Sequence, residues 1–151
     1  MDTITLFTHW SQVRQGLLEA LDKLADAQLG FKPKAILWSL GDTVRHIAEA
    51  ENGWFRHVVT HELSNWEEAE FDPATAASLA SLKALLAGVH ANTENLCLSG
   101  GDAYLARQVS LSWGGQMSVE DVVWHVLEHE IHHRGEVFLM LGILGIAAPD
   151  V

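Results

Sequence analysis

Hydrophobic residues recur every three or four positions along four long stretches of this 151-residue chain, which is the spacing of an amphipathic α-helix. The stretches run from Leu6 to Gln28, from Ser39 to about Thr60, from Asp72 and Pro73 to Ser99–Gly101, and from Ser118 to Gly142 or Gly145. Ser39 and Ser118 are good N-caps, and glycines end the last two stretches. The pattern predicts an all-α protein, an antiparallel four-helix bundle that forms one domain over residues 1–151.

The connection before the fourth stretch has a different pattern. Apolar and polar residues partly alternate from Leu105 to Trp113, and Gly114 and Gly115 end this segment. Alternation with a period of two is typical of extended chain. We expect one short extended segment here, without a sheet partner.

The fourth stretch is apolar on two sides of a helical wheel. One side carries Val122, Val126, Val137 and Met140, and the opposite side carries Trp124, Ile131 and Phe138. A helix that is apolar on two faces is buried on two faces. We expect the second face to meet another subunit, so the sequence predicts a homodimer.

Composition narrows the class of protein. Hydrophobic residues make up 48% of the chain and charged residues 19%, which is enough apolar material for a sizeable core. The formal net charge of −11 would repel a phosphate backbone, so we do not expect a nucleic-acid ligand. The chain begins without the basic and apolar stretches of a signal peptide, and no apolar run reaches the roughly 18 residues of a membrane span. These features predict a cytoplasmic protein that does not enter a membrane.

The chain contains nine histidines but a single cysteine, Cys97. This count excludes a disulfide framework and a cysteine-based zinc finger, so imidazole and carboxylate groups must hold any bound metal. We interpret Cys97, which lies between two leucines, as a small buried hydrophobic residue.

A pair of histidines on the fourth stretch has the spacing of metal ligands. His129 and His133 lie four residues apart on the side that faces the core, and such residues are about 6 Å apart on a helix. Two histidines hold an ion weakly, so we expect a third ligand from another helix. His46 is the best candidate, because the small residues Ala50 and Gly53 share its stripe and leave open volume beside its ring.

Other histidine arrangements are weaker candidates. His125 lies one turn before His129 and is a reserve ligand, whereas His57 is about 16 Å along the helix from His46 and cannot share its ion. The segment from His129 to His133 also fits the zinc-protease pattern, with Glu130 as general base. We reject that interpretation, because the longer protease motif does not continue along the chain and no strands are predicted that would bind a peptide.

Two segments carry a resemblance to a known family. Trp38–Glu51 and Trp124–Glu136 resemble the second-helix and fourth-helix motifs of the DinB-like (YfiT-like) superfamily, and Trp113–Gly114 resembles the turn before its last helix. The resemblance covers nearly the whole chain and implies a four-helix bundle. It also implies that His46, His129 and His133 hold a divalent metal, zinc or nickel in many members. Characterised relatives include enzymes that use low-molecular-weight thiols in transfer or isomerisation reactions, and many members have no assigned activity.

The chain departs from this family at Glu136, where glutamine is common. The residue lies one turn beyond His133 on the same face, so its carboxylate can act as a fourth ligand, orient a water at the metal, or act as a base. The alternative is a salt bridge to Arg134 or to another helix. Glu49, one turn from His46, is a second candidate of lower rank.

These observations lead to two functional hypotheses. The first is a divalent-metal-dependent enzyme that acts on a small molecule, either as a hydrolase or as a thiol S-transferase with a low-molecular-weight thiol as co-substrate. Its site comprises the metal ligands His46, His129 and His133 and the catalytic residue Glu136. The alternative is a non-catalytic dimeric bundle whose metal is structural or absent.

Overall fold

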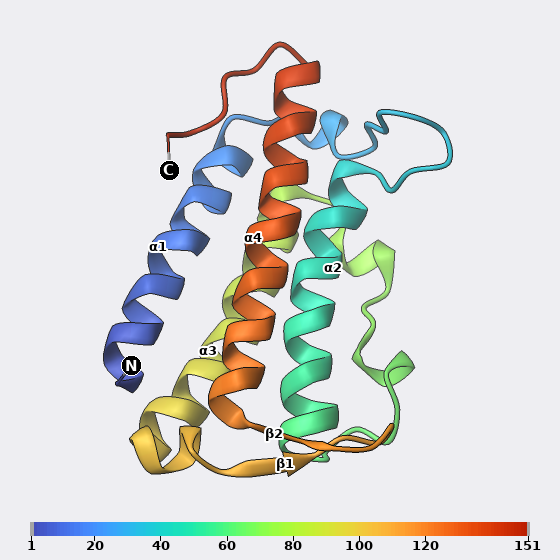
Figure 1. Cartoon of the computed structure of the whole chain (residues 1–151). Helices are drawn as coiled ribbons and strands as arrows, with labels where there is room; N and C mark the ends of the chain where they lie inside the picture. The colour runs from blue at the N-terminus through green and yellow to red at the C-terminus, as the bar shows by residue number, and fades with distance from the viewer. Residues whose placement is uncertain (1, 151) are drawn as a thin grey trace.

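Four long helices form a bundle in the computed structural model, which describes residues 2–150 (Figure 1). They are α1 (Thr3–Asp22), α2 (Leu40–Gly53), α3 (Leu79–Leu105) and α4 (Val119–Ile143). α2 packs against α3 and α4, and α1 also packs against α3 and α4, so α1 and α2 lie diagonally across the bundle. The predicted all-α four-helix fold is confirmed. None of the helices within residues 2–150 is long and apolar enough to cross a membrane.

The helices do not simply alternate in direction. Figure 1 shows α1 and α4 running one way and α2 and α3 the other. The predicted antiparallel packing therefore holds for α1 with α3 and for α2 with α4, whereas α2 and α3 are parallel neighbours. The connection from α2 to α3 must return along the length of the bundle, and it contains short 3₁₀ helices at Glu67–Ala69 and Pro73–Ala76.

Serine caps begin three of the helices. The side chains of Ser39, Ser78 and Ser118 each accept a hydrogen bond from the backbone three residues later, at the start of α2, α3 and α4. The predicted starts at Ser39 and Ser118 are confirmed. Hydrogen bonds from these two serines lower the pKa of Asp42 and Asp121, which keeps both carboxylates ionised in the first turn, where the helix dipole favours a negative charge.

Two of the predicted helix boundaries are wrong. α1 ends at Asp22 instead of Gln28, and α3 begins at Leu79 instead of Asp72, which caps the short helix Pro73–Ala76. Leu24, Leu29 and Ala76 are nevertheless buried in the core. Apolar spacing therefore continues where the chain is no longer α-helical, and the spacing alone does not mark these ends.

The other predicted helix ends differ in smaller ways. The second helix continues beyond α2 as a π-helix, Trp54–Val59, so its predicted end near Thr60 agrees with the structure. The helical backbone of α3 is interrupted at Gly101, whose φ of 60° favours glycine, but a further turn extends to the buried Leu105.

The expectation of an unpartnered extended segment is wrong. β1 (Gln108–Ser110) pairs with β2 (Gln116–Ser118) in a two-stranded antiparallel hairpin, with Val109 opposite Met117. Gly114 and Gly115 both have positive φ in the turn. β2 is three residues long and ends in the cap of α4, so the sequence shows no separate strand pattern there.

The core consists of two apolar clusters, one at each end of the bundle. The cluster at the start of α2 includes Leu17, Leu40, Ile47, Leu86 and Val137, and the cluster next to the hairpin includes Trp10, Phe55, Leu105, Val122 and Leu127. A layer of polar side chains lies between the clusters and includes Arg14, Glu51 and Glu130. Arg14 belongs to α1, and only 6% of its surface is exposed.

Candidate metal centre

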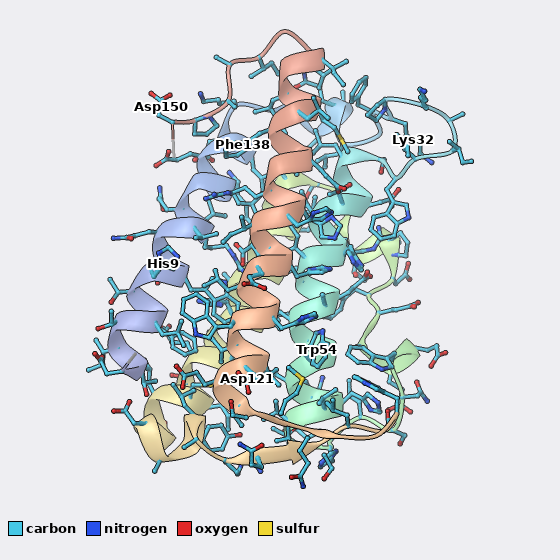
Figure 2. All side chains as sticks on the ribbon, in the orientation of Figure 1. His9, Lys32, Trp54, Asp121, Phe138 and Asp150 are labelled. Atoms are coloured by element: carbon cyan, nitrogen blue, oxygen red, sulfur yellow. The ribbon has the colours of Figure 1, made fainter. Side chains whose placement is uncertain are left out.

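His46 on α2 and the pair His129 and His133 on α4 direct their rings at one point. The Nε2 atom of His129 lies 3.1 Å from that of His46 and 3.2 Å from that of His133. Figure 2 shows ring side chains with nitrogen atoms in the strip where α4 faces α2. The structure therefore brings together the three histidines that the sequence singled out.

These three nitrogens fit a metal ion better than they fit one another. An imidazole Nε2 offers either one hydrogen or one lone pair, so that of His129 cannot satisfy both neighbours by hydrogen bonding. Nitrogens bound about 2.1 Å from one ion, in tetrahedral or octahedral geometry, are about 3.0–3.4 Å apart. The observed separations lie in this range. Within residues 2–150 no fourth His, Cys, Asp or Glu ligand atom joins the three.

The surroundings of the site keep the imidazoles of His129 and His46 neutral. Burial, followed by repulsion from His133 and His46, lowers the pKa of His129 to about 3. Burial and His133 also lower the pKa of His46. Metal ions bind the neutral imidazole, so the lone pairs of His129 and His46 are available at neutral pH.

Carboxylates lie on the far side of two of the rings. Glu136 Oε2 is 2.7 Å from His133 Nδ1, and Glu49 Oε2 is 3.9 Å from His46 Nδ1. In metal sites such carboxylates fix the tautomer and orientation of the ligating ring. By contrast, His129 Nδ1 is buried without a hydrogen-bond partner in the described part of the chain.

The position of Glu136 argues against two of the roles expected for it, whereas its roles as a base and in orienting a water stay predictions. Its carboxylate contacts Nδ1 of His133, not the Nε2 that faces the other rings, so it is not placed as a fourth ligand. It is not paired with Arg134 either, whose Nη1 donates to the backbone oxygen of Val13. The lower-ranked Glu49 is held by Arg45 and by the backbone N–H of Phe71.

The remaining histidine candidates lie outside the site. His125 is exposed and contacts the ring of Trp54, with centroids 4.4 Å apart, so it is not a reserve ligand in this arrangement. His57 Nδ1 lies 3.0 Å from the backbone oxygen of Leu63. Nothing brings either residue to the three converging rings.

Open volume lies elsewhere than expected. A Cβ atom at Gly53 would come within 2.6 Å of the Trp66 ring, so that glycine allows close packing and not a cavity. A cavity of about 350 Å³ instead opens beside His133, between the loop before α2 and the end of α4. Trp38 lines it, with its ring 4.5 Å from that of His46 between centroids. In the sequence, Trp38 is notable only as the first residue of the Trp38–Glu51 motif and as the residue directly before the Ser39 cap.

Sequence reasoning also missed a buried ion cluster next to the site. The Nε atom of Arg14 donates to Glu130 at 2.6 Å and its Nη2 donates to Glu51 at 3.0 Å. Trp10 Nε1 also donates to Glu130, and His90 Nδ1 lies 2.9 Å from Glu51. Arg14 follows Trp10 by four residues, and that spacing is the signal that would have placed it on the buried face.

The carboxylates of Glu51 and Glu130 are both engaged in hydrogen bonds within this cluster. Burial alone would lower the pKa of Arg14, but hydrogen bonds and charges from Glu130 and Glu51 raise it. Glu130 is 1% exposed and its oxygens are taken by Arg14 and Trp10, so it is not available as a general base. This geometry agrees with the rejection of the zinc-protease interpretation.

Comparison with known protein families identifies the family of this chain. The sequence model of the DinB family matches residues 1–151. The chain belongs to the DinB family. A comparison with curated proteins finds no match.

Solved structures related to this DinB-family chain share its fold. A DinB-like protein from Bacillus cereus aligns over 99% of this chain and 97% of its own, with a TM-score of 0.81 and 18% identity. YfiT from Bacillus subtilis, described as a probable metal-dependent hydrolase with an unusual four-helix bundle topology, aligns over 96% and 89%, with a TM-score of 0.74 and 18% identity. A mycothiol-dependent maleylpyruvate isomerase aligns over 91% of this chain and 61% of its own, with a TM-score of 0.68 and 13% identity.

Proposed function

We propose that this DinB-family protein is a divalent-metal-dependent enzyme that acts on a small molecule, with His46, His129 and His133 as its metal ligands. The observation that carries the proposal is the convergence of three Nε2 atoms from two helices beside a cavity. Three protein ligands leave coordination positions for water or substrate, which is the pattern of catalytic sites and not of closed structural ones. Imidazole ligands suit zinc and nickel, the two ions that we propose.

The residues around the ligands have separate roles in this proposal. A divalent ion at this place would supply Lewis acidity and lower the pKa of a water or thiol that it binds. Glu136 holds Nδ1 of His133 and thereby leaves its Nε2 lone pair directed at the site. Trp38 covers the rings of His46 and His133 on the side of the cavity.

The reaction that we propose is hydrolysis or S-transfer from a low-molecular-weight thiol. YfiT is described as a probable hydrolase and another neighbour as a mycothiol-dependent isomerase, which supports both classes of chemistry. Burial raises the pKa of Cys97 to about 12, so this chain supplies no reactive thiolate there and the thiol would arrive as a co-substrate.

The remaining expectations complete the proposal. The net charge of −11 supports a small-molecule substrate over nucleic acid. The cytoplasmic location and the single domain stay predictions. We also propose a homodimer through the outer face of α4, where Ile131 is 39% exposed. Trp124 and Phe138 on the same face are half-buried against this chain's own core.

The test compares the purified protein with the triple variant H46A/H129A/H133A. We expect about one zinc or nickel ion per chain in the wild type and none in the variant, because three lone pairs are lost together. Turnover is measured as hydrolysis of p-nitrophenyl acetate and as conjugation of cysteamine to monobromobimane. The matched control replaces three exposed histidines, His9, His61 and His125, and should keep both metal and activity.

Three results separate the hypotheses. Equal metal in the wild type and the triple variant contradicts the site. Metal that is bound at the three histidines and raises the melting temperature, with no turnover in either assay, favours the non-catalytic bundle with a structural metal. Metal and turnover that are lost together support the enzyme.

A further inference from the structure

The cavity beside the three histidines is built mainly from apolar side chains. Its walls include Ile36, Leu37 and Trp38 from the loop before α2, and Leu139 and Met140 from α4. At about 350 Å³ it lies at the lower end of the range of small-molecule sites, about 300–1,000 Å³. Its size and lining therefore fit a single small apolar group.

The charged groups of the cavity disfavour anions. Among the residues that line it, only His133 and Glu136 are ionisable, and no lysine or arginine is present. In the metal-free protein an anionic ligand would meet the Glu136 carboxylate with no cation in the cavity wall to compensate it, and the whole chain carries a net charge of −11. An uncharged or cationic ligand avoids this repulsion.

Several of the apolar walls are exposed to solvent. Ile36 is 90% exposed, Leu139 64% and Trp38 50%. A ligand in the cavity would remove this apolar surface from water, which favours binding of an aliphatic or aromatic group. Trp38 connects the cavity to the metal centre, because its ring also lies 6.0 Å from that of His133 between centroids.

We propose that this cavity recognises the non-reacting part of the substrate and selects a small, uncharged or cationic apolar group, such as an aromatic ring. The reaction of this substrate at the metal centre rests on the proposed function, whereas the kind of group that the cavity binds rests on the cavity alone. The polar reacting atom of such a substrate lies toward His133, and its apolar body lies between the loop and α4.

The first experiment tests the cavity without metal. Benzyl alcohol, benzylamine and benzoate are titrated into the metal-free protein, and NMR shifts of the Trp38 indole N–H and the Met140 methyl group are followed. We expect saturable shifts with benzyl alcohol and benzylamine, and at least about tenfold weaker binding of benzoate, because its carboxylate lies near Glu136. Equal binding of benzoate, or no shift with any probe, overturns the proposal.

The second experiment links the cavity to the metal centre. Acetohydroxamate, benzohydroxamate and para-carboxybenzohydroxamate are titrated into zinc-loaded protein by calorimetry. Burial of the phenyl ring should make benzohydroxamate bind about tenfold or more tightly than acetohydroxamate, and the added carboxylate should remove that gain. Equal affinity of benzohydroxamate and acetohydroxamate overturns the proposal, whereas zinc that fails to bind the three histidines contradicts the proposed function instead.

A pair of exposed positions on α4 provides matched variants. Leu139→Lys places an ammonium group at the cavity wall, and Ile143→Lys places one a turn further along, where the side chain is 54% exposed and outside the cavity lining. We expect the first variant to gain affinity for benzoate and the second to behave as wild type. Identical effects of the two overturn the proposal. A second combination of results also overturns the proposal: the solution mass changes in Leu139→Lys but not in Ile143→Lys, and the probes cause no shifts in the wild type. Such results would show that a second copy of the chain covers this surface.

Discussion

At the scale of single residues, the contact between Glu136 and His133 gives the site its best-defined feature. The carboxylate lies on Nδ1, which leaves Nε2 as the nitrogen that faces His129. His46 has a carboxylate three residues later in the same way, although Glu49 is more distant from its ring. Only the Glu136 contact is short enough for a hydrogen bond that fixes the tautomer, so it is the more useful one to change.

Removal of the Glu136 carboxylate should weaken metal binding. We expect Glu136→Ala to lower zinc affinity by about 10–100-fold, because the His133 ring loses the group that orients it. Glu136→Gln should lose less, since its amide oxygen can still accept from Nδ1–H. Competition with a chromophoric chelator measures both affinities.

Glu128→Ala is the control for this series, because it removes an exposed carboxylate from the same helix. It should bind zinc as the wild type does. An affinity of Glu136→Ala equal to that of Glu128→Ala would show that Glu136 does not position His133.

At the scale of elements, the rotation of α4 about its axis determines two sites at once. His129 turns toward α2, whereas the next residue, Glu130, turns toward α1 and accepts hydrogen bonds from Trp10 and Arg14. Arg14 also donates to Glu51 on α2 and to the backbone oxygen of Leu86 on α3. One guanidinium thus contacts the three other helices, and the buried ion cluster holds α4 in the rotation that presents its histidines.

Loss of this guanidinium should destabilise the fold strongly. We expect Arg14→Met to lower the free energy of unfolding by about 3–5 kcal/mol, because Glu51 and Glu130 are left buried without their cation. Urea unfolding followed by circular dichroism at neutral pH measures the difference. Adding Glu51→Gln and Glu130→Gln to Arg14→Met should restore part of the stability, since the uncompensated charges are then removed.

Arg134→Met is the comparison for this prediction. Arg134 donates to a backbone oxygen and lies over the Phe138 ring, but its described contacts include no carboxylate. Its loss should cost about 1 kcal/mol. If Arg14→Met were no less stable than Arg134→Met, the buried cluster would contribute little to the fold.

The sequence predicted what lies within one helix better than what lies between helices. The i, i+4 spacing placed His129 and His133 on one face, and the serine caps located the starts of α2 and α4. The pairing of Arg14 with Glu51 and Glu130 involves three different helices, so the spacing of residues within one helix does not predict it. The hairpin partner and the cavity wall at Trp38 were missed for the same reason, because each depends on chain that meets only after folding.

At the scale of the whole molecule, the parallel course of α2 and α3 brings the ligands together from distant parts of the chain (Figure 1). His46 and His129 are 83 residues apart in sequence and belong to helices that are antiparallel neighbours. A bound ion would connect α2 to α4 near the middle of the bundle. Metal should therefore slow the separation of these two helices as well as the global unfolding of the chain.

The homodimer is tested at this scale. We expect the protein to sediment at twice 16.6 kDa at micromolar concentration, and Ile131→Glu to shift it to the monomer, because the substitution puts a charge on the outer face of α4. Leu98→Glu, on an exposed position of α3, is the control and should leave the mass unchanged. A wild type of 16.6 kDa at these concentrations would contradict the dimer.

The polar layer across the middle of the core has a consequence for how this protein can change. Because the two apolar clusters do not share members, substitutions in one should add to substitutions in the other with little coupling. The cavity borders the cluster at the start of α2, whereas the cluster beside the hairpin is remote from it. New substrate preferences can thus accumulate at one end of the molecule while the opposite end retains a reserve of stability, an arrangement that favours evolvability.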